Sequence, residues 1–73
     1  MDYKAIADQV GPRVGATQEW IFHVLREGII SAKLPGGMQL KQDEISAALN
    51  VSHIPVREAL RRLEAQGLVR IHP

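Results

Sequence analysis

The 73-residue sequence has no cysteine and no long apolar run. The absence of cysteine excludes a disulfide-stapled scaffold and a thiolate metal site, and it fits a reducing cytoplasm, which is the location we expect. No apolar stretch approaches the ~20 residues that a membrane helix needs, and the first residues do not form a signal peptide. A single small domain is expected. A chain this short without disulfides rarely builds a generous core, which favours support from a partner subunit or from further sequence.

A strong charge of one sign is also lacking, since the formal net charge is only +1. Residues 53–73 carry a mild excess of +2, from four arginines against Glu58 and Glu64. Nucleic-acid-binding domains often show a stronger basic bias. Charge alone therefore does not indicate a nucleic-acid partner.

Turn signals separate an N-terminal arm, residues 1–16, from the rest of the chain, residues 17–73. In the arm, Tyr3, Ile6 and Val10 recur at helical spacing before Gly11-Pro12, which predicts one or two amphipathic turns. Such a segment is too short to be a stable helix in isolation. The arm must therefore pack against another apolar surface or remain without stable structure.

Beyond the arm, apolar periodicity predicts three helices. The first runs from about residue 17 to 32 with Thr17 as its N-cap, the second from 42 to 49, and the third from 53 to 66 with Ser52 as its N-cap. Asn50 tolerates the left-handed conformation that the tight turn between the last two helices requires. Residues 68–71 are predicted to form a short strand. The fold class we predict is mainly α, a three-helix winged helix-turn-helix with a short β element.

The third predicted helix has two different faces. Its inward face follows the i, i+3, i+4, i+7 rule and comprises Val56, Ala59, Leu60 and Leu63. His53, Arg57 and Arg61, spaced four apart, form a separate stripe that suits the DNA major groove, which is ~12 Å wide. An alternative is that the arginines only form a solvated face, with Glu58 and Arg62 as an ordinary surface ion pair.

On the DNA hypothesis, each side chain has a distinct expected contact. Arg57 can donate two hydrogen bonds to guanine O6 and N7, while Arg61 contacts the DNA backbone. Ser52, with the helix N-terminus, can hold a phosphate, and Ile54 can touch a thymine methyl group. Arg62 lies on the flank of the stripe.

Several motifs together resemble the N-terminal domain of GntR-family bacterial transcription regulators. They are Pro35-Gly36-Gly37, Leu40, Glu44-Ile45, the run from Val51 to Glu64, and Gly67-Leu68-Val69. The resemblance covers residues 17–73, and the run from Pro55 to Leu60 looks most like the branch related to the fatty-acid regulator FadR. It implies a winged helix that binds palindromic double-stranded DNA operators as a homodimer, with a small-molecule effector on a larger C-terminal domain. On that pattern the second wing strand and the effector domain are absent, and we expect an N-terminal piece of a longer regulator.

The resemblance also assigns site residues. Ser52 and Arg57 match family positions that contact phosphate and base, respectively. His53 stands where the family usually has arginine, Ile54 where threonine is common, and Lys41 where a serine cap is usual. The lysine either weakens the start of the second helix or puts a charge near phosphate. The expected DNA-binding residues are therefore Ser52, His53, Ile54, Arg57, Arg61, Arg62 and Lys41.

No residue pattern indicates catalysis. The three histidines, His23, His53 and His72, have no carboxylate at metal-ligand spacing, and no nucleophile stands with a base and an orienting group. We expect no enzyme, no catalytic residue, no metal and no cofactor. The alternative function is a winged-helix protein-interaction or dimerisation module without specific DNA binding, and the arm could dock on a neighbouring chain.

Overall fold

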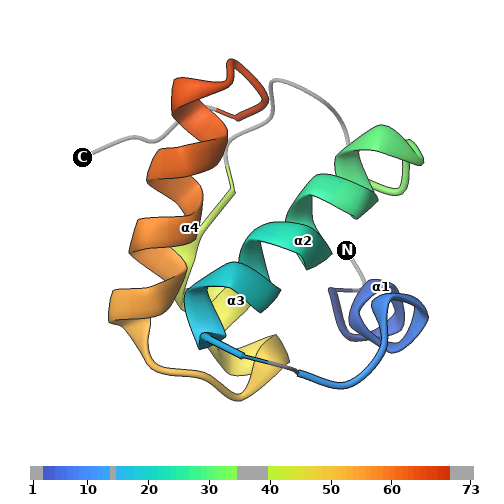
Figure 1. Cartoon of the computed structure of the whole chain (residues 1–73), viewed down its shortest axis with the longest axis vertical. Helices are drawn as coiled ribbons and strands as arrows, with labels where there is room; N and C mark the ends of the chain where they lie inside the picture. The colour runs from blue at the N-terminus through green and yellow to red at the C-terminus, as the bar shows by residue number, and fades with distance from the viewer. Residues whose placement is uncertain (1–2, 14, 35–39, 70–73) are drawn as a thin grey trace.

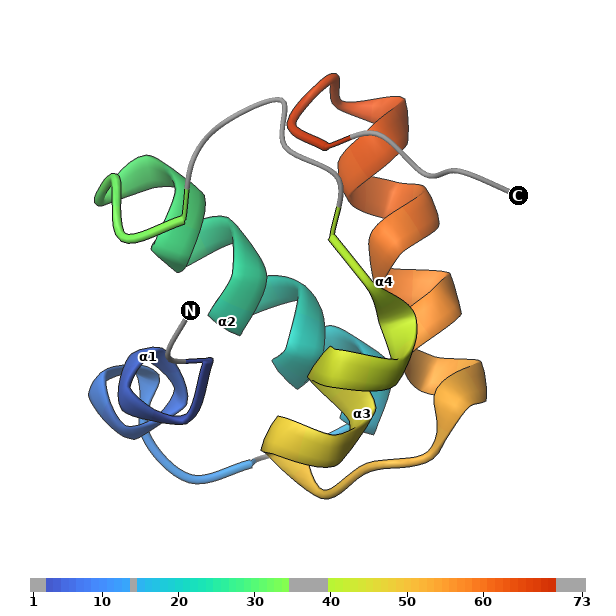
Figure 2. The ribbon, with the colours of Figure 1, turned by 180° about the vertical axis from the view of Figure 1, so that it is seen from behind.

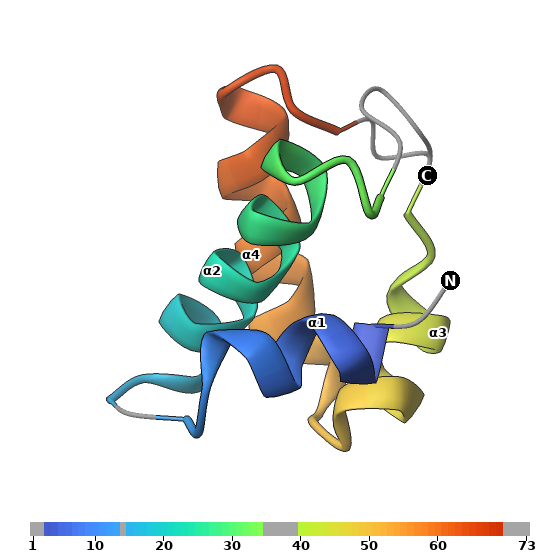
Figure 3. The same ribbon diagram turned by 90° about the vertical axis from the view of Figure 1, so that its right-hand side faces the viewer.

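The computed structural model describes residues 3–13, 15–34 and 40–69, and within these ranges it contains four helices and no strand. The helices are α1 (Tyr3–Val10), α2 (Thr17–Ile30), α3 (Gln42–Leu49) and α4 (His53–Ala65). The longest two, α2 and α4, pack against each other, and α1 packs on α2 and α3 (Figures 1 and 3). The expected three-helix fold is corrected to four helices, because the arm is also folded.

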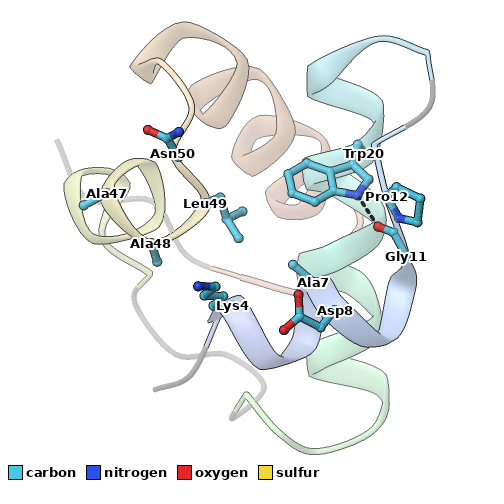
Figure 4. A pocket seen from close by; sticks show the side chains of 10 residues that line it. All are labelled: Lys4, Ala7, Asp8, Gly11, Pro12, Trp20, Ala47, Ala48, Leu49 and Asn50. Carbon is cyan, nitrogen blue, oxygen red and sulfur yellow. Dashed lines mark hydrogen bonds between the residues drawn. The ribbon is translucent and has the colours of Figure 1, made fainter.

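The arm becomes a helix because the core stabilises it. Tyr3 and Ile6 are 3% and 2% exposed, and they join one apolar cluster with residues of the other three helices. The indole Nε1–H of Trp20 donates a hydrogen bond of 3.1 Å to the Gly11 carbonyl, which ties the end of α1 to α2 (Figure 4). These apolar side chains are therefore covered within the chain itself rather than left for a neighbouring chain.

Thr17 is not the N-cap of α2, as its sequence context had predicted. Ala16 has extended backbone angles, and its carbonyl accepts the first helical hydrogen bond from the Trp20 N–H at 3.1 Å. Thr17 is therefore the first helical residue, and its hydroxyl accepts a hydrogen bond from Arg13 instead. The helix ends at Ile30, two residues before the predicted end.

The tight turn between α3 and α4 matches its prediction. Asn50 adopts the left-handed conformation (φ 55°, ψ 51°), and the Val51 N–H donates to the Ser46 carbonyl at 3.1 Å. Ser52 is the N-cap of α4 by its extended backbone, although its side chain makes no capping hydrogen bond. These local features fix the angle at which α4 leaves α3 (Figure 2).

The chain turns away from the axis of α4 at Gly67, which has a positive φ of 74°. The Gly67 N–H donates to the Glu64 carbonyl and the Leu68 N–H to the Leu63 carbonyl, both at 2.9 Å, which is the Schellman pattern. The strand predicted over residues 68–71 is not seen at Leu68 and Val69, while residues 70 and 71 lie outside the described ranges. Val69 is nevertheless buried in the core. The described ranges contain no strand that could pair with Leu68 and Val69, so ladder hydrogen bonds do not stabilise a strand at these two residues.

Tyr3 offers a test of the α1 packing. Its hydroxyl is buried and has no hydrogen-bond partner among the described residues. Burial, together with the nearby Glu44 charge, raises the pKa of Tyr3 above its usual value of 10.0. An unpaired buried hydroxyl is costly, so Tyr3→Phe is expected to raise the free energy of unfolding by about 1 kcal/mol.

The same pKa shift gives the direction of a pH effect. Because the pKa of Tyr3 is higher in the folded state, the part of the folding stability that depends on a neutral Tyr3 is fully present below pH ~10. That stability is lost as the pH rises through the folded-state pKa, where the buried phenol must ionise. Urea unfolding at pH 7 and at alkaline pH checks both statements. A loss of stability in Tyr3→Phe at pH 7 would show that the hydroxyl is satisfied in the folded protein.

Candidate nucleic-acid interface

The two faces of α4 are separated as the sequence predicts. Its inward residues are between 0% and 3% exposed and pack mainly against α2; they are Val56, Ala59, Leu60 and Leu63. His53, Arg57 and Arg61 are all exposed, and their spacing of four puts them on one face that is displaced from the buried face. We call these three residues the recognition stripe.

The helix that carries the recognition stripe lies at the edge of the molecule. In Figure 1, α4 occupies the left edge of the ribbon, with the other helices on its opposite side. His53 and Arg61 are eight positions apart, so the stripe extends about 12 Å along the helix axis. This length is comparable to the width of the major groove.

Three further predicted residues lie at the starts of α3 and α4. Ile54 is 74% exposed, an unusual position for a large apolar side chain, and Ser52 is exposed at the N-cap. Lys41 is the N-cap of α3 and is also exposed. The beginnings of α3 and α4 thus present polar and cationic groups together with one bare apolar side chain.

Arg62, the remaining predicted residue, is directed towards α2 instead of joining the recognition stripe. Its guanidinium lies 4.0 Å from the centre of the Phe22 ring and forms an ion pair with the Glu19 carboxylate. The expected surface pair with Glu58 is therefore replaced by a contact between two helices. No local sequence pattern indicates this contact, because Glu19 and Arg62 are 43 residues apart.

Replacing Arg62 tests whether it holds α4 on α2. Arg62→Ala removes the stack on Phe22 and the half-exposed ion pair, and it is expected to lower the free energy of unfolding by about 1 kcal/mol. Glu19→Gln keeps the stack and should cost less than about 0.5 kcal/mol. Urea unfolding of both variants measures the difference. Unchanged stability with weakened DNA binding would instead make Arg62 a DNA contact.

A contact that the sequence did not predict lies at the edge of the recognition stripe. The Oδ1 atom of Asp43, in the first turn of α3, is 3.5 Å from Nε2 of His53. Both side chains are exposed, by 88% and 59%. From the sequence alone, the expected role of Asp43 is to stabilise the N-terminal end of its helix through its negative charge. The tight turn between α3 and α4 brings its side chain to His53.

A second surface feature is an open groove of about 660 Å³ between α1, α3 and the start of α2 (Figure 4). Its lining comprises Lys4, Ala7, Asp8, Gly11, Pro12, Trp20, Ala47, Ala48, Leu49 and Asn50. None of these residues belongs to α4. The groove is therefore distinct from the recognition stripe.

Neither a metal site nor a membrane segment is found in the described ranges. No group of three or more histidine, cysteine, aspartate or glutamate side chains there could hold a metal ion. His72 lies outside these ranges. None of the four helices is long and apolar enough to span a bilayer.

Comparison with known proteins gives a consistent result. The family described as "Bacterial regulatory proteins, gntR family" matches residues 17–73. The chain is 35% identical over 68 residues to the HTH-type transcriptional repressor RspR of Escherichia coli (strain K12), which covers 93% of this chain and 29% of that protein. It is 48% identical over 46 residues to a probable D-xylose utilization operon transcriptional repressor of Paenarthrobacter nicotinovorans, covering 60% of this chain and 20% of that protein.

A further relative is an uncharacterized HTH-type transcriptional regulator of Agrobacterium vitis, 42% identical over 52 residues, or 71% of this chain and 30% of that protein. The chain thus spans less than a third of the length of these relatives. All three are named as regulators or repressors rather than enzymes. No solved structure shows significant similarity to the chain.

Proposed function

Because the chain belongs to the gntR family of bacterial regulatory proteins, and is a DNA-binding part of a transcription regulator, we propose that it reads a specific operator with α4 in the major groove. The observation that carries this proposal is the division of α4 into a buried apolar face and the exposed recognition stripe. A helix held rigidly by one face can present the other to base edges without reordering.

The proposed contacts follow from the chemistry and position of each side chain. Arg57, in the second turn of α4, donates to guanine O6 and N7, whereas Arg61 and Lys41 attract phosphates. Ser52 and the free N–H groups at the start of α4 bind a phosphate. His53 and the bare Ile54 side chain meet base edges, with Ile54 against a thymine methyl group.

Arg62 has a different proposed role. Its contacts with Phe22 and Glu19 direct the guanidinium towards α2. It therefore acts as a positioning residue that fixes α4 on α2, and it does not contact the DNA directly.

At the level of the whole protein, we propose a homodimer in the bacterial cytoplasm that spans a palindromic operator, since operator symmetry mirrors protein symmetry. Residues 17–73 would form a winged helix-turn-helix of the FadR-like branch. A small-molecule effector would bind the part of the regulator that these residues do not include. The relatives are more than three times as long as the matched segment, which leaves room for such a domain.

Selection from a random duplex library tests the proposal. The chain is dimerised by fusion to a coiled coil and selection is run at low and moderate salt. The expected result is a short palindrome that remains enriched at the higher salt. Weak binding without sequence preference that disappears with salt would reduce the interaction to phosphate attraction and contradict the proposal.

A second candidate function is a protein-interaction module, and the groove between α1 and α3 is the observation that favours it. The groove has an apolar wall that includes Trp20 and Leu49, and the charged side chains of Lys4 and Asp8 at its edge. On this alternative, substitutions in the recognition stripe would leave the regulator's activity unchanged, whereas Ala48→Glu in the groove would abolish it. A reporter assay with the full regulator distinguishes the two.

A further inference from the structure

The pair formed by Asp43 and His53 puts a carboxylate beside the surface that the proposed function assigns to DNA. The Oδ1 atom of Asp43 lies 3.5 Å from the imidazole of the first residue in the recognition stripe. The Asp43 side chain is 88% exposed, so the protein does not bury its charge. A duplex that contacts His53 must therefore bring its phosphates close to this carboxylate.

The other charged groups of α3 and α4 make Asp43 distinct. Lys41, at the start of α3, and Arg57 and Arg61, on α4, are exposed cations. Glu44, the next residue in the chain, acts on the buried Tyr3 of α1, so its charge lies on the α1 side of α3. Glu58, on α4, is half-buried. Glu64, three positions beyond Arg61 on α4, is exposed and engages in a contact of its own. Asp43 is the acidic group of α3 that contacts the recognition stripe.

We propose that Asp43 is an affinity-limiting residue, whose charge opposes the approach of DNA phosphates and so lowers the sequence-independent part of binding. The inference rests on the proposed function, because it requires the recognition stripe to face DNA. Attraction to the DNA phosphates supplies essentially all of non-specific binding, and its strength depends on the number of cationic side chains that contact the DNA backbone. A carboxylate at the same edge offsets part of that attraction, while the hydrogen bonds of Arg57 to a base are made independently of it.

The test compares affinities for a random-sequence duplex at several salt concentrations. Asp43→Asn is expected to tighten binding by about threefold at low salt, because it removes one unit of repulsion at close range. The gain should shrink at higher salt as screening increases, and the slope of log K against log salt should steepen by up to about one. Asp43→Glu keeps the charge and should bind as the unaltered chain does.

Two controls isolate the position of the charge. Asp8→Asn makes the same change in net charge on α1, which does not contact α4, and should leave the affinity nearly unchanged. The gain from Asp43→Asn should also persist when His53 is replaced by glutamine, because the repulsion acts directly on phosphate. An unchanged affinity and slope in Asp43→Asn, an equal gain in Asp8→Asn, or loss of the gain in the His53→Gln background would overturn the proposal.

The two proposals fail in different ways. If the library selection enriches no sequence but Asp43→Asn still tightens salt-dependent binding, the operator hypothesis is wrong and Asp43 still limits affinity. If a palindrome is enriched and Asp43→Asn changes neither affinity nor slope, the inference about Asp43 alone is wrong.

Discussion

Arg57→Ala is expected to weaken binding to the selected operator by about 1–3 kcal/mol and to relax the preference at one base position. Arg57 is exposed on the recognition stripe one turn into α4, and the ion pairs found among residues 3–13, 15–34 and 40–69 do not include it. Its guanidinium is therefore free to form the planar pair of hydrogen bonds that distinguishes guanine from the other bases. Binding of random-sequence DNA should fall much less than binding of the operator.

Two arginine variants serve as controls for this prediction. Arg61→Ala removes a phosphate contact, so it should weaken all sequences alike and flatten the salt slope by about one. Arg26→Ala removes the same charge from an exposed position on α2 and should change neither affinity nor sequence preference. Fluorescence anisotropy with operator and random duplexes measures all three. Equal losses on both duplexes for Arg57→Ala would contradict its role in base reading.

The largest expected effect on stability comes from Leu63→Ala. Leu63 is fully buried on the inward face of α4, where the helix packs against α2. Truncation of a buried leucine removes its burial free energy and leaves a cavity, which typically costs about 2–5 kcal/mol. For a domain of this size, a loss of about 3 kcal/mol lowers the melting temperature by about 15 °C.

Ile54→Ala is the matched control, because it truncates an aliphatic side chain on the same helix. Ile54 is 74% exposed, so its truncation should change the free energy of unfolding by less than about 0.5 kcal/mol. It should instead weaken binding to operators that carry a thymine at the contacted position. Thermal unfolding followed by circular dichroism compares the two variants. Equal destabilisation would mean that α4 is not oriented as described.

The parts of the fold that could be predicted are those set by local chemistry. The bounds of α3, the left-handed Asn50 and the start of α4 depend on residues within a few positions of each other. The inward face of α4 also follows from its own periodicity. The α1 helix could not be predicted in full, since Tyr3 and Ile6 are stabilised by burial against segments distant in the sequence.

The candidate site shows the same division. The recognition stripe was evident from the spacing of His53, Arg57 and Arg61. The direction of Arg62 was not, because it depends on Phe22 and Glu19 in another helix. The contact of Asp43 with His53 arises only once the turn has set the angle between α3 and α4. Contacts between elements therefore decide which of the charged side chains remain available to DNA.

The most direct test of the central hypothesis is an NMR titration of the ¹⁵N-labelled chain with the selected duplex. We predict that the amide signals of residues 52–61 and of Lys41 shift most, and that those of α1 and of the groove stay nearly unchanged. Such a result would locate the DNA on the outer side of α4. The largest shifts at Lys4, Asp8 and Ala48, with little change along α4, would contradict the account and point to the groove as the binding surface.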